Sequence, residues 1–114
     1  MQNYQENLLF QHRTSSVNDE FVYQCPEFKT AIIKSIVIAN VTDAAITYRL
    51  FMNPGSTSVG IANSLGYDIA ILANATQLWR GFGGITHPTS VGIQSSVANS
   101  IVITGYGILM GTGE

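Results

Sequence analysis

The sequence is short of charged residues. Only 11% of its 114 residues are charged, whereas 46% are hydrophobic, and an average soluble domain carries about 25% charge. Because a free monomer needs charge to stay soluble, the shortage suggests that much of the surface faces other protein. A compact β-sandwich rich in Ser, Thr, Asn and Gly would be polar without being charged, so this second interpretation stays open.

The sequence also lacks paired cysteines, clustered cations and long apolar stretches, and each absence excludes a class of protein. Cys25 is the only cysteine, so no intrachain disulfide can form, and a reducing compartment is slightly favoured. The five Lys and Arg residues are dispersed and the net charge is −2, which argues against a nucleic-acid groove because such grooves need clustered cations. No apolar stretch approaches the roughly 20 residues that span a bilayer, and residues 1–16 lack the pattern of a signal peptide. We therefore expect neither a nucleic-acid partner nor a membrane partner.

The length of the chain indicates one domain. Residues 1–7 are polar and rich in Gln and Asn, and we interpret them as an arm that is flexible or ordered by a neighbour. Residues 8–114 form the predicted domain. A domain of this size buries roughly two thirds of the surface of its unfolded chain, so it can fold without a disulfide or a metal.

Residues 29–52 form the stretch around which the chain is organised. They predict two long strands joined as a hairpin by a tight polar turn at residues 40–44. In the second strand Ile46, Tyr48 and Leu50 alternate with other residues, and successive side chains of a strand point to opposite faces, so this strand has one buried face. The first strand is apolar on both sides over its middle, as expected where a second sheet or a neighbouring subunit covers both faces.

The rest of the chain predicts short strands separated by turns. Three glycines within residues 81–84 are expected to interrupt the regular structure and to begin a loop. Gly105 and Gly107 in the last strand indicate a bulge or a close approach by another backbone. About eight strands, without helical periodicity, predict an all-β fold, a single antiparallel β-sandwich that is jelly-roll-like or immunoglobulin-like. Besides the two long ones, we expect strands at residues 8–10 (an edge strand), 20–25, 67–72, 76–80, 91–95 and 99–111.

No group of residues carries a recognised chemistry. Cys25, His12 and His87 could in principle supply a nucleophile and its bases, but Cys25 at a strand end is more simply a small apolar residue. These residues are also too few, and at no recognised spacing, for a metal site. We expect no catalytic residue, no cofactor and no metal, and hence no enzyme. Four carboxylates could form a catalytic pair but stand at predicted turns or strand starts, where acidic residues are ordinary: Asp19, Glu20, Asp43 and Asp68.

Aromatic residues offer a different kind of site. Trp79, Phe82, Tyr67 and Tyr106 could form a platform for sugar rings, which would make the protein a carbohydrate-binding module. Core packing is the commoner role of such residues. Trp79, which stands beside the glycines of residues 81–84, is the best candidate for an exposed contact.

Three segments resemble parts of small virion proteins of tailed bacteriophages. They are residues 33–51 (IKSIVIANVTDAAITYRLF), 67–77 (YDIAILANATQ) and 91–105 (VGIQSSVANSIVITG). The resemblance implies a small β-sandwich of the virion, assembled in the host bacterial cytoplasm, that decorates or cements the capsid or belongs to the neck, tail or fibre. It also implies a trimer or another symmetric multimer that contacts the major capsid protein or other virion proteins. The shared motifs are structural, so no catalytic residue is carried over.

Adhesion between proteins agrees with the few charges and with the lack of a reactive group. We expect residues 1–10 to act as an arm that adds to the sheet of a neighbour or lies across it. Deletion of these ten residues is then expected to weaken assembly and to leave the sandwich folded. The residues expected at the interface are Leu8, Leu9, Phe10, Trp79 and Phe82.

Overall fold

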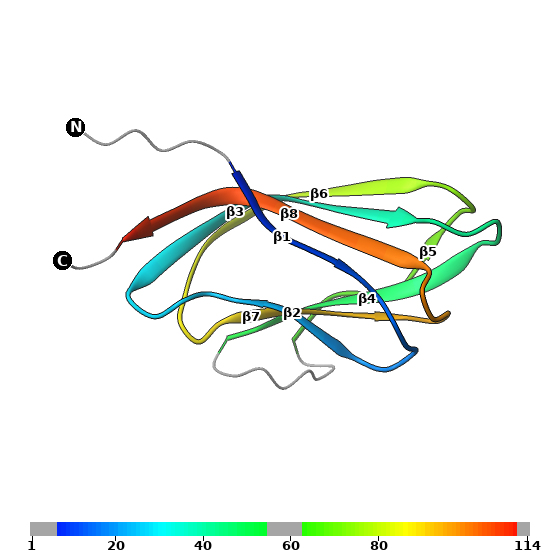
Figure 1. Ribbon diagram of the computed structural model, residues 1–114, viewed down its shortest axis with the longest axis horizontal. Helices are drawn as coiled ribbons and strands as arrows, with labels where there is room; N and C mark the ends of the chain where they lie inside the picture. Colours follow the sequence, from blue (N-terminus) through cyan, green and yellow to red (C-terminus); the bar gives the residue numbers. More distant parts are fainter. Residues whose placement is uncertain (1–6, 55–62, 112–114) are drawn as a thin grey trace.

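The computed structural model describes residues 7–54 and 63–111, which form eight β-strands in two antiparallel sheets of four strands each. The first sheet has the strand order β1-β8-β3-β6, and the second has the order β2-β7-β4-β5. The two sheets face each other, with the first above the second in Figure 1. The predicted all-β antiparallel sandwich is confirmed. Its strands are β1 (Asn7–Arg13), β2 (Glu20–Gln24), β3 (Lys29–Asn40), β4 (Ile46–Asn53), β5 (Ser64–Ile71), β6 (Thr76–Thr86), β7 (Ser90–Ser95) and β8 (Ile101–Gly111).

The strands are connected as in a jelly roll. β1 pairs with β8, β2 with β7, β3 with β6 and β4 with β5, so the two halves of the chain pair in a nested, antiparallel arrangement. Only the connection from β4 to β5 stays within one sheet, and every other connection crosses to the opposite sheet. An immunoglobulin sandwich divides its strands differently between the sheets. Of the two expected architectures, the jelly roll is therefore the one observed.

Residues 29–52 form a corner between the sheets and not the expected hairpin. The turn at residues 40–44 is present, but β3 pairs with β6 and β8 while β4 pairs with β5 and β7. Two consecutive strands can bury their apolar sides by pairing in one sheet or by facing each other across a sandwich. The alternation of residues is the same in both cases, which is why the sequence pointed to the wrong pairing.

Asn40 holds this corner together. Its side chain is buried, and Nδ2 donates hydrogen bonds to the carbonyl oxygens of Ala44 at 2.8 Å and Leu72 at 3.0 Å. Its Oδ1 accepts a hydrogen bond from the backbone N–H of Thr42 at 3.0 Å. Leu72 belongs to the corner between β5 and β6, so a single amide side chain ties together two places where the chain changes sheets.

The core lies between the two sheets. Ile46, Tyr48 and Leu50 of β4 are at most 6% exposed, which confirms the predicted buried face of this strand. Ile36 of β3 is fully buried against the second sheet, whereas its neighbour Val37 points to the opposite side and is only partly buried. The second sheet therefore covers one face of β3 and leaves its other apolar face on the outside of the sandwich.

Strand β6 runs through residues 81–84, where a loop was expected. Gly81 and Gly83 have φ angles of +83° and +76°, at the point where β6 and β3 change register. Glycine adopts positive φ at little cost, so these residues allow the strand to bulge and then to continue to Thr86. The expected strand at residues 76–80 is the first half of this longer one.

Another backbone approaches β8 closely at Gly107, as predicted, whereas the close group at Gly105 is a side chain. A Cβ atom added at Gly107 would lie 1.9 Å from the carbonyl oxygen of Ile32 on β3, and one at Gly105 would lie 2.1 Å from the ring of Phe10 on β1. Neither distance is possible between real atoms. The two glycines therefore allow β8 to fit between β1 and β3 in the first sheet.

The expected arm is only partly among the described residues. Residues 1–6 lie outside them, and Asn7 already begins β1 at the edge of the first sheet. Phe10 is 7% exposed and stacks on Tyr23 with ring centroids 5.2 Å apart. Deletion of residues 1–10 would remove Phe10 from the core, so the expectation that this deletion leaves the sandwich intact is revised.

We predict that Gly107→Ala destabilises the protein by about 1–3 kcal/mol. The added methyl group would collide with the Ile32 carbonyl and disturb the pairing of β3 with β8. Urea denaturation measures the change in the free energy of unfolding. Gly111→Ala on the same strand is the control, because its added Cβ meets nothing within 4 Å. Equal stabilities of the two variants would contradict the close approach.

Candidate functional site

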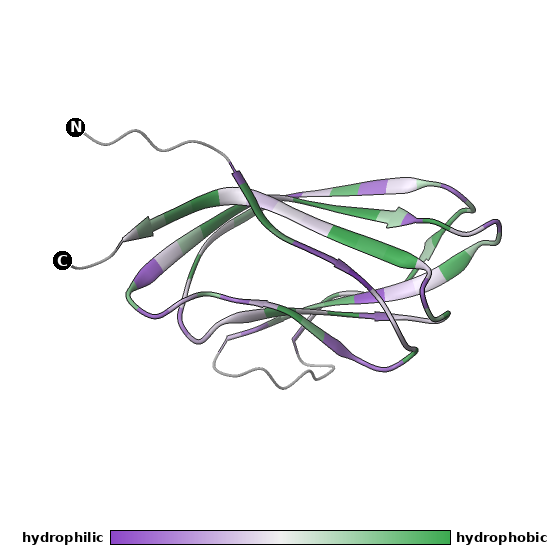
Figure 2. Ribbon diagram, in the orientation of Figure 1, coloured by the Kyte–Doolittle hydropathy of each residue, from purple (hydrophilic) through white to green (hydrophobic). Residues whose placement is uncertain are grey.

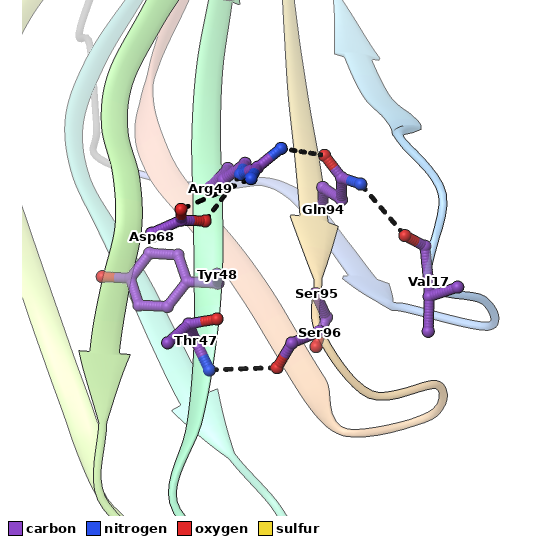
Figure 3. A pocket seen from close by; sticks show the side chains of 8 residues that line it. All are labelled: Val17, Thr47, Tyr48, Arg49, Asp68, Gln94, Ser95 and Ser96. Carbon is purple, nitrogen blue, oxygen red and sulfur yellow. Dashed lines mark hydrogen bonds and ion pairs between the residues drawn. The ribbon is translucent and has the colours of Figure 1, made fainter.

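A polar pocket of about 220 Å³ opens on the outer face of the second sheet. It draws its side chains from the neighbouring strands β4, β5 and β7 and from the connection between β1 and β2. Sequence reasoning missed the pocket, because it depends on the pairing of strands that are distant in the chain. The lining residues, drawn in Figure 3, are Val17, Thr47, Tyr48, Arg49, Asp68, Gln94, Ser95 and Ser96.

Arg49 at the centre of this pocket already has partners within the protein. Its Nε donates a hydrogen bond to Asp68 Oδ1 at 2.7 Å, and Nη1 donates one to Gln94 Oε1 at 3.4 Å (Figure 3). The guanidinium also lies 3.9 Å from the centre of the Tyr67 ring. The hydrogen bond to Asp68 raises the pKa of Arg49. The positive charge of Arg49 is balanced by the negative charge of Asp68. These contacts therefore link β4 to β5 and β7, and they leave no unpaired charge for a ligand.

Glu20 and His12 connect the two sheets at the edge formed by β1 and β2. His12 Nε2 donates a hydrogen bond to Glu20 Oε1 at 2.6 Å, and the backbone N–H groups of Ser15 and Ser16 each donate one to Oε2 at 2.9 Å. Burial alone would raise the pKa of Glu20, but the hydrogen bonds outweigh it and hold this pKa below its ordinary value. Glu20 therefore fastens the loop before β2, a role that its place at a strand start did not reveal.

The residues considered as a nucleophile with bases do not form such a group. The Cys25 thiol is buried and donates to the carbonyl oxygen of Ile85 at 3.4 Å, and burial raises its pKa. His87 Nδ1 donates to the backbone carbonyl of Cys25 at 3.0 Å and not to the thiol. His12 is bonded to Glu20 instead.

In the described ranges, no cluster of three or more His, Cys, Asp or Glu side chains could hold a metal ion. The part of the chain that the structure describes has no helix long and apolar enough to cross a membrane.

The four aromatic residues considered as a platform are dispersed. Trp79 packs against the core, and its Nε1 donates to the hydroxyl of Tyr48 at 2.9 Å. Phe82 also packs against the core, whereas Tyr67 contacts Arg49 on the second sheet and Tyr106 belongs to the first sheet. Trp79 is thus only partly buried, and its contact with a ligand stays a prediction. It faces the core, whereas Tyr106 lies on the outer side of the same sheet, so these two rings are on opposite faces.

The five residues expected at an interface differ in exposure. Leu8 is 55% exposed at the edge of the first sheet. Leu9, Trp79 and Phe82 are partly buried against the core, and Phe10 is inside it. The contribution of Leu8 to an interface stays a prediction, and the others are largely committed to the protein's own packing.

The outer face of the first sheet, which we call the open face, carries apolar side chains from all four strands beside polar ones. Residues directly paired across antiparallel strands point to the same side, and the residues paired with Val37 and with Tyr106 all point away from the core. Leu8, Leu78 and Tyr106 on this face are 55%, 49% and 38% exposed. Figure 2 shows hydrophobic residues along both β3 and β8. The open face includes Leu8, Ile32, Ser35, Val37, Leu78, Tyr106 and Ile108, with Lys34 and Arg80 beside them. Gln11 also lies on this side and donates a hydrogen bond to the buried Thr104 at 3.0 Å.

Comparison with known proteins adds no assignment, since no family model and no curated protein matches the chain.

We predict that Glu20 stabilises the fold at neutral pH and loses this effect in acid. Because its folded-state pKa is below the ordinary value of 4.5, the contribution is complete above that pH and disappears as the pH falls through the folded-state pKa. Thermal unfolding between about pH 7 and pH 3 measures it. Glu20→Gln should lower the Tm at neutral pH and reduce the loss of Tm in acid.

Asp19→Asn is the control for this prediction, since Asp19 is exposed and is the adjacent carboxylate. A Glu20→Gln variant that loses as much Tm in acid as the Asp19→Asn variant would contradict the role of Glu20.

Proposed function

We propose that the protein is a structural subunit of a tailed-bacteriophage particle, a decoration or cement protein of the capsid that acts by adhesion through its open face. The open face carries this proposal. It has apolar side chains from all four strands of the first sheet, and such a surface on a soluble protein commonly marks an interaction site.

The size of the open face suits a protein interface. Four strands spaced about 4.8 Å apart, with about ten residues rising about 3.3 Å each, give an area on the order of 600 Å². Each partner in a standard protein interface buries about 800 Å². The open face and its rim can therefore supply most of one side of a specific interface.

The resemblance to small virion proteins supports the same function. The segment at residues 33–51 contains the corner between β3 and β4, and the segment at residues 91–105 contains the corner between β7 and β8. The shared motifs thus fall at places where the chain changes sheets. In this proposal the partners are other copies of the chain, in a trimer or another symmetric multimer, and the major capsid protein or another virion protein.

Purified particles of the phage that encodes the protein provide the test. We expect quantitative mass spectrometry to find the protein in intact virions at a copy number comparable with that of the major capsid protein. A few copies per particle would indicate the neck or tail instead. Absence from intact particles, with the protein abundant in the infected cell, would refute the proposal.

A pair of leucine variants tests whether the open face is the adhesive surface. Leu78→Ser on this face should weaken binding to particles that lack the protein by about tenfold, since it removes apolar area from the interface. Leu72→Ser is the control, because Leu72 is 72% exposed but lies in the corner between β5 and β6. Equal binding by the two variants would show that adhesion uses another surface.

A further inference from the structure

Two cations lie side by side on the open face, and neither has a partner among the described residues. Lys34 stands at the bulge of β3 between Ile33 and Ser35, and Ser35 pairs directly with Arg80 on β6. Lys34 and Arg80 line one shallow hollow of about 340 Å³ together with Ser35 and Leu78. Within residues 7–54 and 63–111, neither cation makes a hydrogen bond or an ion pair.

The other two arginines of the chain are used differently. Arg49 is paired with Asp68, and Arg13 donates two hydrogen bonds to the carbonyl oxygen of Asn99. The chain has a net charge of −2, so carboxylates are not scarce. Those of the described residues nevertheless lie off the open face, on the second sheet or in connections between strands: Asp19, Glu20, Glu27, Asp43 and Asp68.

Two cations beside one hollow repel each other, and the attraction of an anion placed between them outweighs that repulsion. A carboxylate suits the hollow, because an ammonium, a guanidinium and a serine hydroxyl can all donate hydrogen bonds to its two oxygens. Leu78 beside them would contact the aliphatic part of an Asp or Glu side chain.

We propose that this hollow receives a carboxylate side chain of the partner protein, so that the open face selects an apolar surface bearing Asp or Glu. This inference rests on the function proposed above and names the chemistry of the partner. A second copy of the chain does not fit in a face-to-face arrangement, because it would bring four cations together. A nucleic acid fits poorly, because phosphate recognition needs more cations and less apolar surface.

A titration followed by amide chemical shifts tests the hollow without any particle. Tetraglutamate at concentrations on the order of millimolar should shift the amides of residues 34, 35, 78 and 80, and the shifts should disappear in about 500 mM NaCl. No shift at these residues overturns the inference. Larger shifts with an oligothymidylate at the same concentration would assign the hollow to phosphate and also overturn it. Shifts of the same amides on simple dilution would assign it to a second copy, with the same consequence.

Binding to particles that lack the protein tests the role of the hollow in assembly. The double variant Lys34→Gln, Arg80→Gln should bind about tenfold more weakly than the wild type and should lose most of the salt dependence of binding. Lys29→Gln is the matched control, because Lys29 is exposed at the start of β3 and lies outside the hollow. Wild-type affinity of the double variant overturns this inference and leaves the proposed function standing. A wild-type protein that does not bind the particles overturns the proposed function itself.

Discussion

A jelly roll depends on satisfying the backbone where the chain leaves one sheet for the other. At these corners the carbonyl and N–H groups lose their ladder partners, and an unpaired buried group costs about 1–3 kcal/mol. Asn40 solves this problem for two corners with one side chain, since its amide bonds to Ala44 and Thr42 in its own corner and to Leu72 in the next. That amide therefore links two sheet-changing corners of the sandwich, while the apolar core holds the sheets together.

The two outer faces of the sandwich differ in how their charges are arranged. On the second sheet, Arg49 is balanced by Asp68 and held by Gln94 and the Tyr67 ring. On the first sheet, Lys34 and Arg80 have no partner among the described residues and lie beside Ser35 and the apolar Leu78. Surface ion pairs contribute only about 0–1 kcal/mol to folding, so this difference has little effect on stability. It distinguishes a face whose arginine is paired within the protein from one whose two cations are available to the proposed partner.

The sequence predicted those features that depend on residues close together in the chain. The alternation of Ile46, Tyr48 and Leu50 identified a half-buried strand, and Gly105 and Gly107 indicated close approach. The first follows from the alternation of side chains between the two faces of a strand, and the second from the lack of a side chain in glycine.

Features that depend on the pairing of strands distant in the chain could not be predicted from the sequence pattern. Whether the Trp79 side chain points into the core depends on the register of β6 against β3. The pocket around Arg49 depends on which strands lie beside β4. The outcome at residues 81–84 likewise depended on distant pairing. A glycine cluster can end a strand, but it can also form a bulge within a strand when a long partner strand continues beside it. Here β3 is twelve residues long and supplies that partner.

The bulge of β6 also bears on how copies of this protein avoid sticking together by their edges. β6 lies at one edge of the first sheet, and an unpaired edge of eleven residues could act as a template for another chain, as in amyloid. Gly81 and Gly83, with left-handed backbone angles in mid-strand, break the straight row of donors and acceptors that such growth requires. The two glycines therefore disfavour growth by pairing of one β6 edge with another, even at high local concentration.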